Sequence, residues 1–351
     1  MEGPIILKSN SDEFQKVLWN GEYCDGERCF HVAPSEMIQT DPQVKSVAFK
    51  IVSSRPSTLK IYLESLRAIS LTATALPGIV VMLLGLKSFY MVSWPHFILA
   101  LFGAVFMQIA VNVYNDVEDH LKLIDFPGNP GGSGVLTKGW VSAKALRRFG
   151  HVFLALGVLC GIPILIDNFE ALLLVGSIGV IGVIGYSGWP LRLKYRALGD
   201  VNVFLLCGPV LGAGFSLATF DQIIPGMWQV SVFFGFLACG ILHVNNMQDI
   251  PLDRESGART LAGELGYKKS KIVLVSFYFA AYLALLHGVL TSVLPWQVAG
   301  TLLLLPVIFQ IVSICYKASG PDSPLLNGIR IKAAQAHLLG GILLAISLMF
   351  V

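Results

Sequence analysis

Charged side chains are scarce in this chain. Only 13% of its 351 residues are Asp, Glu, Lys or Arg, whereas 54% are hydrophobic and the mean hydropathy is +0.69. A soluble domain usually carries about 25% charged residues. The composition therefore excludes an ordinary soluble protein. The net charge of only +3 argues against a nucleic-acid partner, because nucleic-acid binding needs a strongly positive surface.

Two further features are missing. The first 55 residues hold no apolar stretch of the kind found in a signal peptide. The six cysteines form no zinc-binding pattern, and we expect Cys24 and Cys29 to be reduced thiols in a cytoplasmic tail. The other four lie in apolar runs, where a thiol is usually a small apolar filler: Cys160, Cys207, Cys239 and Cys315.

Apolar residues, by contrast, gather into long runs. Each run is about long enough to cross a bilayer core of about 30 Å. We count about nine of them: 69–90, 95–115, 149–166, 170–188, 200–218, 227–247, 271–293, 295–315 and 334–351. So many long runs cannot all be buried in one soluble core. The sequence therefore predicts an all-α, polytopic membrane domain over residues 56–351.

Residues 1–55 form a polar tail ahead of this domain. Asn20-Gly21 and Asp25-Gly26 stand between short apolar stretches, and such dipeptides favour tight hairpin turns. We therefore expect a small β-meander in the tail. Lys and Arg are concentrated in every second connection between the apolar runs, as in 117–148 and 248–271. The positive-inside rule places these connections, and the tail with them, in the cytoplasm.

Two polar clusters stand where apolar runs end on that side. Their members recur at helical spacing, so that each cluster occupies one face of a helix. The first cluster is Asn112, Asn115, Asp116 and Asp119. The second cluster is Asn246, Asp249 and Asp253.

Carboxylates at the edge of a membrane span are costly and usually functional. Facing carboxylates repel one another unless cations lie between them, and carboxylate and amide oxygens suit Mg²⁺, which also retains water and substrate phosphate. The clusters therefore predict Mg²⁺ sites that hold a diphosphate, with nearby Lys and Arg neutralising it as it leaves. Two alternatives are solvated helix ends and a cation-coupled transporter, although transporters usually place ionisable groups near the bilayer midplane.

Three motifs resemble the UbiA superfamily of intramembrane prenyltransferases over about residues 60–351. Asn115-Asp116-x-x-Asp119, with Asp125 six residues on, is similar to the first Asp-rich motif, and the segment 246–255 is similar to the second. The stretch from Tyr186 to Asp200 resembles the loop between them. The spacing is similar to that of the 1,4-dihydroxy-2-naphthoate polyprenyltransferases of menaquinone synthesis.

The resemblance implies nine transmembrane helices around a central cavity, capped by the two Asp-motif loops. It also implies Mg²⁺-dependent transfer of a polyprenyl group from an allylic diphosphate to an aromatic acceptor. An apolar cavity open to membrane lipid suits a polyprenyl tail. A different aromatic acceptor in a specialised pathway is the second reading of the same chemistry.

The resemblance also assigns roles to residues. The metal ligands would be Asn115, Asp116, Asp119, Asn246, Asp249 and Asp253. The catalytic residues would be Asp119, Asp125, Asp249, Asp253, Lys194 and Tyr186, with Asp125 near the acceptor and Lys194 on the diphosphate. The substrate-binding residues would be Asn112, Asn115, Lys194, Tyr186, Lys138, Arg67 and Arg254.

Three places depart from the family pattern. Leu123 stands where many relatives have glycine, and residues 127–134 form a flexible turn-rich stretch without the usual acidic and arginine residues. Pro251 lies between Asp249 and Asp253. Because proline removes a backbone donor and disfavours helix at the residue before it, we expect a kink there that alters the Asp spacing.

Overall fold

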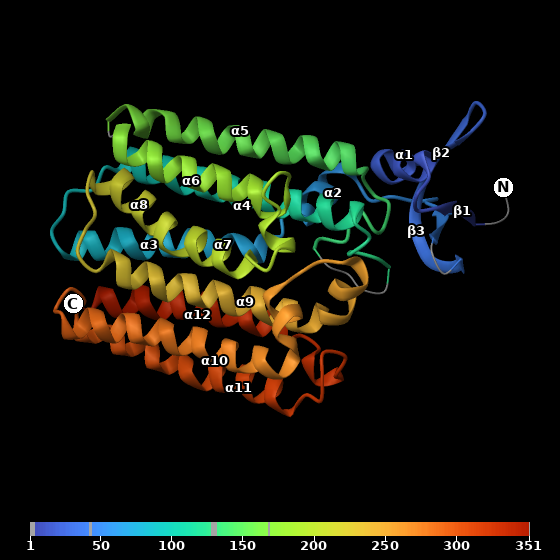
Figure 1. Ribbon diagram of the computed structural model, residues 1–351. Helices are drawn as coiled ribbons and strands as arrows, with labels where there is room; N and C mark the ends of the chain where they lie inside the picture. Colours follow the sequence, from blue (N-terminus) through green and yellow to red (C-terminus); the bar gives the residue numbers. More distant parts are fainter. Residues whose placement is uncertain (1–3, 42–43, 128–131, 168, 351) are drawn as a thin grey trace. The chain divides into compact units, whose positions relative to one another are not determined.

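The computed structural model describes residues 4–41, 44–127, 132–167 and 169–350 (Figure 1). The chain forms two compact units, each with its own hydrophobic core. The first unit comprises Met1–Ala68 and Ile109–Leu154, and the second comprises Ile69–Gln108 and Ala155–Val351. Residues 128–131 of the turn-rich stretch lie outside the described residues. The predicted domain boundary after residue 55 stays a prediction.

A sheet and a helix fill residues 5–51 of the first unit, which we call the N-terminal module. In sheet order its antiparallel strands are β1 (Ile5–Lys8), β4 (Val44–Ile51), β3 (Arg28–Asp41) and β2 (Glu22–Asp25). Helix α1 (Asp12–Asn20) connects β1 to β2, and Ser11 caps it by accepting a hydrogen bond from the Phe14 backbone N–H. Phe14, Val17 and Leu18 of α1 pack into the core of the module.

The two predicted turns of the tail have different outcomes. Asp25 pairs with Arg28, so Gly26 and Glu27 form a two-residue hairpin as expected. Asn20-Gly21 forms no hairpin: Gly21, with φ 67°, ends α1, and a left-handed glycine is the usual end of a helix. The expectation of reduced thiols is also wrong for this structure. Cys24 lies directly opposite Cys29 on the neighbouring strand, and the two form a disulfide.

Nine helical segments of the described residues are long and apolar enough to span a membrane, as predicted. The single helices among them are α3 (Ala68–Lys87), α4 (Trp94–Leu121), α5 (Ala143–Asp167), α6 (Phe169–Ser187), α9 (Met227–Ser256) and α10 (Leu261–Leu290). The composite ones are α7 (Gly199–Leu205) with η2 (Leu206–Val210) and α8 (Leu211–Phe220), η3 (Trp296–Leu304) with α11 (Leu305–Lys317), and η4 (Pro324–Leu326) with α12 (Ile329–Met349). The short helices α2 (Thr58–Ser65) and η1 (Leu193–Tyr195) lie outside the spans.

Helix α9 forms the centre of the second unit. It packs along α10 and α12 (Figure 1), and its Phe233, Phe234 and Leu237 are almost completely buried. The π-helical segment η2 approaches α9 closely: a Cβ added at Gly208 would lie 2.8 Å from the backbone oxygen of Ser231. Small residues at such contacts allow helices to pack in lipid, where the hydrophobic effect does not drive association.

Large apolar side chains also cover the outside of the second unit. Phe309 is 74% exposed and Leu174 is 63% exposed, which is expected of surfaces that face hydrocarbon. Helix α9 continues through Pro251 to Ser256, so the predicted change in Asp spacing is wrong. A proline removes one backbone donor, and the helix continues to Ser256 despite this loss.

Candidate active site

The last turns of α4 carry the first cluster, in the first unit. Asn112, Asp116 and Asp119 are buried, and the side chain of Asn115 donates a hydrogen bond from Nδ2 to Asp119 Oδ2 at 2.8 Å. The four residues lie on one helix, as predicted. Asn112 Nδ2 also donates to the backbone oxygen of Leu66 at 3.4 Å. The cluster therefore joins the end of α4 to the chain that enters α3.

Asp116 is held on both carboxylate oxygens. Arg67 Nη1 lies 3.1 Å from Asp116 Oδ1, while Ser133 donates to Oδ2 from its backbone N at 2.9 Å and from its Oγ at 2.6 Å. Gly132 has φ 58°, and a Cβ added there would lie 2.2 Å from Asp116 Oδ1. Only glycine fits this approach, so the segment after the cluster closes directly onto Asp116.

Asp125 lies just beyond the end of α4. Leu123 ends the helix with φ 58°, a conformation that glycine adopts more easily, and the backbone N of Ile124 donates to Asp119 O at 2.9 Å. The Asp125 side chain is buried. Leu121, Leu123 and Phe126 pack against the core of the N-terminal module. The departure from the family pattern at Leu123 thus coincides with a contact to the additional module.

Charged residues also take part in the contact between the end of α4 and the N-terminal module. Glu118 in α4 accepts hydrogen bonds from Lys122 Nζ at 2.7 Å and from Arg147 Nη2 at 2.6 Å. The Arg147 guanidinium lies 4.8 Å from the centre of the Trp19 ring in α1. Lys138, predicted to bind substrate, lies 3.8 Å from Glu64 and also stands over the Trp140 ring.

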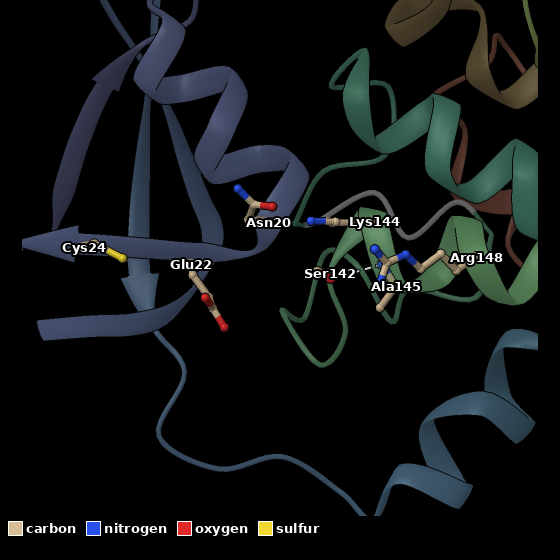
Figure 2. Close-up of a pocket in the computed structure, with 7 residues that line it drawn as sticks. All are labelled: Asn20, Glu22, Cys24, Ser142, Lys144, Ala145 and Arg148. Carbon is tan, nitrogen blue, oxygen red and sulfur yellow. Dashed lines mark hydrogen bonds between the residues drawn. The ribbon is translucent and has the colours of Figure 1, made fainter.

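An open pocket of about 310 Å³ lies between the N-terminal module and the start of α5 (Figure 2). Its lining residues are Asn20, Glu22, Cys24, Ser142, Lys144, Ala145 and Arg148. None of the predicted ligands lines it. Lys144 and Arg148 are exposed, so the pocket is a surface groove with two basic side chains. It lies outside the candidate site, because no predicted ligand lines it.

The second cluster lies on the last turns of α9, in the second unit. Asn246 and Asp253 are buried, and Thr260 donates from Oγ1 to Asp253 Oδ2 at 2.9 Å. Asp249 is more open, with a side chain 25% exposed, and it forms an ion pair with Arg330 of α12. Arg330 Nε also donates to Gln248 Oε1 at 2.8 Å.

The loop between α6 and α7 is tied to the segment that follows the second cluster. The backbone N of Ala197 donates to Arg259 O at 2.6 Å. Tyr186 is buried at the end of α6, and Lys194 lies in η1 with its Nζ 5.6 Å from the centre of the Tyr195 ring. Arg254 is exposed and donates to Gly263 O at 3.4 Å.

Sequence reasoning missed two features of the second unit. No role was predicted for Arg330, and nothing in the sequence pairs it with a residue 81 positions earlier. Asp200 and His243 form a buried pair, with Asp200 Oδ1 and His243 Nδ1 3.1 Å apart. A histidine inside an apolar run was the available signal for this pair.

The donor atoms suit a hard divalent metal. Both clusters offer carboxylate and amide oxygens, and Mg²⁺ typically binds one or two carboxylates and completes its shell with water and phosphate oxygens. In the described part of the chain no group of three or more His, Cys, Asp or Glu side chains is already arranged around a metal position. The fit therefore applies to a metal that arrives with a phosphate ligand.

Comparison with known proteins decides the family. The model described as "UbiA prenyltransferase family" matches residues 74–326. The chain belongs to the UbiA prenyltransferase family. It is therefore a prenyltransferase and an integral, multi-pass membrane protein, as its nine candidate spans also indicate.

Individual UbiA relatives agree. The 1,4-dihydroxy-2-naphthoate octaprenyltransferase of Bacillus subtilis (strain 168) is 27% identical over 266 residues, which cover 74% of this chain and 79% of that protein. The apo structure of a UbiA homolog from Aeropyrum pernix K1 has a TM-score of 0.60 and 20% identity, over 80% of this chain and 98% of that one. A UbiA homolog from Archaeoglobus fulgidus bound to GPP and Mg²⁺ has a TM-score of 0.53 and 17% identity, over 81% and 99%. These structures confirm the all-α UbiA fold.

Proposed function

We propose that this prenyltransferase moves a polyprenyl group from an allylic diphosphate to 1,4-dihydroxy-2-naphthoate, a step of menaquinone synthesis. The observation that carries the proposal is the pair of Asn/Asp clusters, most of whose members are buried, each at the end of an apolar helix. The Bacillus subtilis relative supports this acceptor by its name, and the Archaeoglobus fulgidus homolog supports the donor and the metal by its bound GPP and Mg²⁺.

The first unit would contribute ligands for Mg²⁺ and the acceptor residue. Asn115 and Asp119, already hydrogen-bonded to each other, would supply the metal ligands of the first cluster. Asp116 would support them by holding Arg67 and Ser133 in place. Asp125 would orient the ring hydroxyl of the acceptor.

The second cluster would supply Mg²⁺ ligands of its own. Asp249 and Asp253 would bind Mg²⁺ directly or through water, with Asn246 in support. Lys194 would contact the diphosphate, and Tyr186 would line the site of the prenyl group or of the allyl cation. Arg254, whose guanidinium donates a hydrogen bond to Gly263 O, would also bind the diphosphate.

The chemistry follows from charge. Bound Mg²⁺ supplies positive charge to the leaving diphosphate, as it does in other phosphate chemistry. Breaking the allylic C–O bond leaves the electron pair on the diphosphate and an allyl cation on the prenyl chain. The electron-rich ring of the acceptor attacks this cation, and the ring then loses its carboxylate as CO₂. Aromatic and carboxylate side chains stabilise the cation while it exists.

We also propose that the loops carrying the clusters, and the N-terminal module, face the cytoplasm. The basic residues of every second connection support this orientation. A membrane-permeant reductant first opens the Cys24–Cys29 disulfide, so that both thiols can be labelled. Modification by a membrane-impermeant maleimide only after permeabilisation is the expected result, and labelling in intact cells would reverse the orientation.

Prenyl transfer in membranes that contain the chain tests the proposal. The assay supplies Mg²⁺, 1,4-dihydroxy-2-naphthoate and allylic diphosphates of several lengths, with mass spectrometry of the lipid extract and an EDTA control. The expected product is a decarboxylated prenyl-naphthoquinol, detected as such or as the quinone that forms from it in air, and it disappears with EDTA. Release of diphosphate without that product would assign a different aromatic acceptor. Ion flux in liposomes without any donor, and no transfer, would contradict the enzymatic function.

A further inference from the structure

A cation from α12 engages the second cluster. The Arg330 guanidinium donates from Nη2 to Asp249 Oδ1, and from Nε to Gln248 Oε1 at 2.8 Å. The amide nitrogen of Gln248 donates in turn to Leu326 O at 3.0 Å, which fixes which way the amide faces. One guanidinium therefore binds two consecutive residues of α9, and none of the roles proposed above uses it.

The start of α12 holds Arg330 at this place. Gly328 has φ 77°, and its backbone oxygen accepts hydrogen bonds from the backbone N of Ile331 and of Lys332, both at 3.1 Å. Leu326 and Ile329, on either side of the turn, are almost fully buried. The backbone is therefore anchored, while the Arg330 side chain stays 31% exposed and can change partners without moving the helix.

A divalent metal and a diphosphate, the two proposed ligands of the second cluster, would together lead the Arg330 guanidinium to change its partner. A divalent metal that binds Asp249 competes with the guanidinium for the same carboxylate oxygen. A diphosphate that arrives with the metal offers phosphate oxygens, to which a planar guanidinium donates paired hydrogen bonds more favourably than to a single carboxylate oxygen. Arg330 has a new partner at the moment when it loses the old one.

We propose that Arg330 is an exchangeable counter-ion: it neutralises Asp249 while the metal is absent and binds the diphosphate of the donor once metal occupies Asp249. This inference rests on the proposed function, because it requires a metal and a diphosphate at the second cluster. Gln248 is the positioning residue that presents the guanidinium to both partners.

Binding measurements on the full chain in lipid nanodiscs test the exchange without turnover. Mn²⁺ alone is titrated first by electron paramagnetic resonance, and inorganic pyrophosphate is titrated next at saturating Mn²⁺. The variants are Arg330→Gln, Arg330→Lys and, as a matched control, Lys332→Gln, which removes the same charge from the same turn of α12.

Opposite effects on the two ligands are expected. Arg330→Gln should bind Mn²⁺ roughly fivefold more tightly, because a competing half-buried ion pair is gone, and bind pyrophosphate roughly tenfold more weakly. Arg330→Lys should keep the wild-type Mn²⁺ affinity but recover only part of the pyrophosphate affinity, since it has the charge without the planar fork. Lys332→Gln should match wild type for both ligands.

Other results would overturn the inference. Weaker Mn²⁺ binding by Arg330→Gln would mean that Arg330 merely holds Asp249 in place, and unchanged pyrophosphate affinity would remove its second partner. If Arg330→Gln fails to fold, Gln248→Met leaves every charge present and must still weaken pyrophosphate binding, or the exchange is wrong. Absence of Mn²⁺ binding by the wild-type chain both without and with pyrophosphate would overturn the proposed function together with this inference, whereas intact Mn²⁺ binding with no exchange overturns the inference alone.

Discussion

The two polar clusters have the same donor groups at similar helical spacing, but their surroundings differ. In the first cluster Asp116 is buried and held by Arg67 and by the backbone of Ser133, so the chain itself encloses it. In the second cluster Asp249 is partly exposed and forms an ion pair with the side chain of Arg330. The spacing of a motif decides which donors share a face, while the neighbouring elements decide how easily a ligand reaches them.

Removing one charge from each cluster gives the largest expected effect. Asp119→Asn and Asp249→Asn should each lower the rate of prenyl transfer by about 1,000-fold, because each takes an anionic oxygen from a metal site while keeping the shape of the side chain. The measurement is product formation in membranes at equal amounts of protein. Asp221→Asn, outside both clusters, should remain active. Retained turnover in either cluster variant would falsify the idea that both clusters bind metal.

The enclosure of the first cluster can be weakened at one glycine. Gly132→Ala should lower the free energy of unfolding by about 2–3 kcal/mol, since the new methyl group meets Asp116 Oδ1 and the backbone is left-handed. Gly134→Ala is the matched control: it also has a positive φ, of 71°, but its Cβ would have no neighbour nearer than 3.7 Å. We expect a loss of only about 1 kcal/mol there. Thermal unfolding in detergent measures both, and equal losses would contradict the close fit of Gly132.

The two lysines predicted to bind substrate lie in different units, Lys138 in the first and Lys194 in the second. Lys194→Ala should raise the donor KM about tenfold with a smaller change in kcat, because it removes a phosphate contact. Lys138→Ala should have less effect, since Lys138 is already paired with Glu64. Steady-state kinetics with donor and acceptor varied separately decides this. A change confined to the acceptor KM in Lys194→Ala would move the diphosphate away from η1.

The smallest expected effect concerns the Asp253 hydrogen bond of the second cluster. Thr260→Val removes the hydroxyl that donates to Asp253 Oδ2, and stability should fall by about 1 kcal/mol. The same Oγ1 also accepts from the Gly263 backbone N and so caps α10. Thr260→Ser retains the hydroxyl and should unfold at nearly the wild-type temperature. A similar loss in both variants would contradict a stabilising role for the hydroxyl.

The membrane helices and the faces of the clusters followed from the sequence because each depends on local rules. Helices in lipid must satisfy their own backbone, so long apolar runs predict spans, and a period of 3.6 residues places Asn115 beside Asp119. The residues that pair with the carboxylates come from distant parts of the sequence, so these tertiary contacts could not be predicted from local patterns. Arg330 reaches Asp249 across 81 positions, and the Cys24–Cys29 disulfide depends on the register of β2 and β3. Pro251 was misjudged because a proline disfavours a helix at the preceding residue without forbidding it, and α9 continues through it.

The packing of Leu121, Leu123 and Phe126 into the core of the N-terminal module has a consequence for biosynthesis. The ribosome releases the strands and α1 of the module before it makes α4, so the apolar surface that receives these three side chains stays uncovered in the nascent chain. The module can complete its core only after the first two spans have been made. Its folding is therefore coupled to membrane insertion. A chain truncated before Leu121 would expose an apolar patch that favours aggregation.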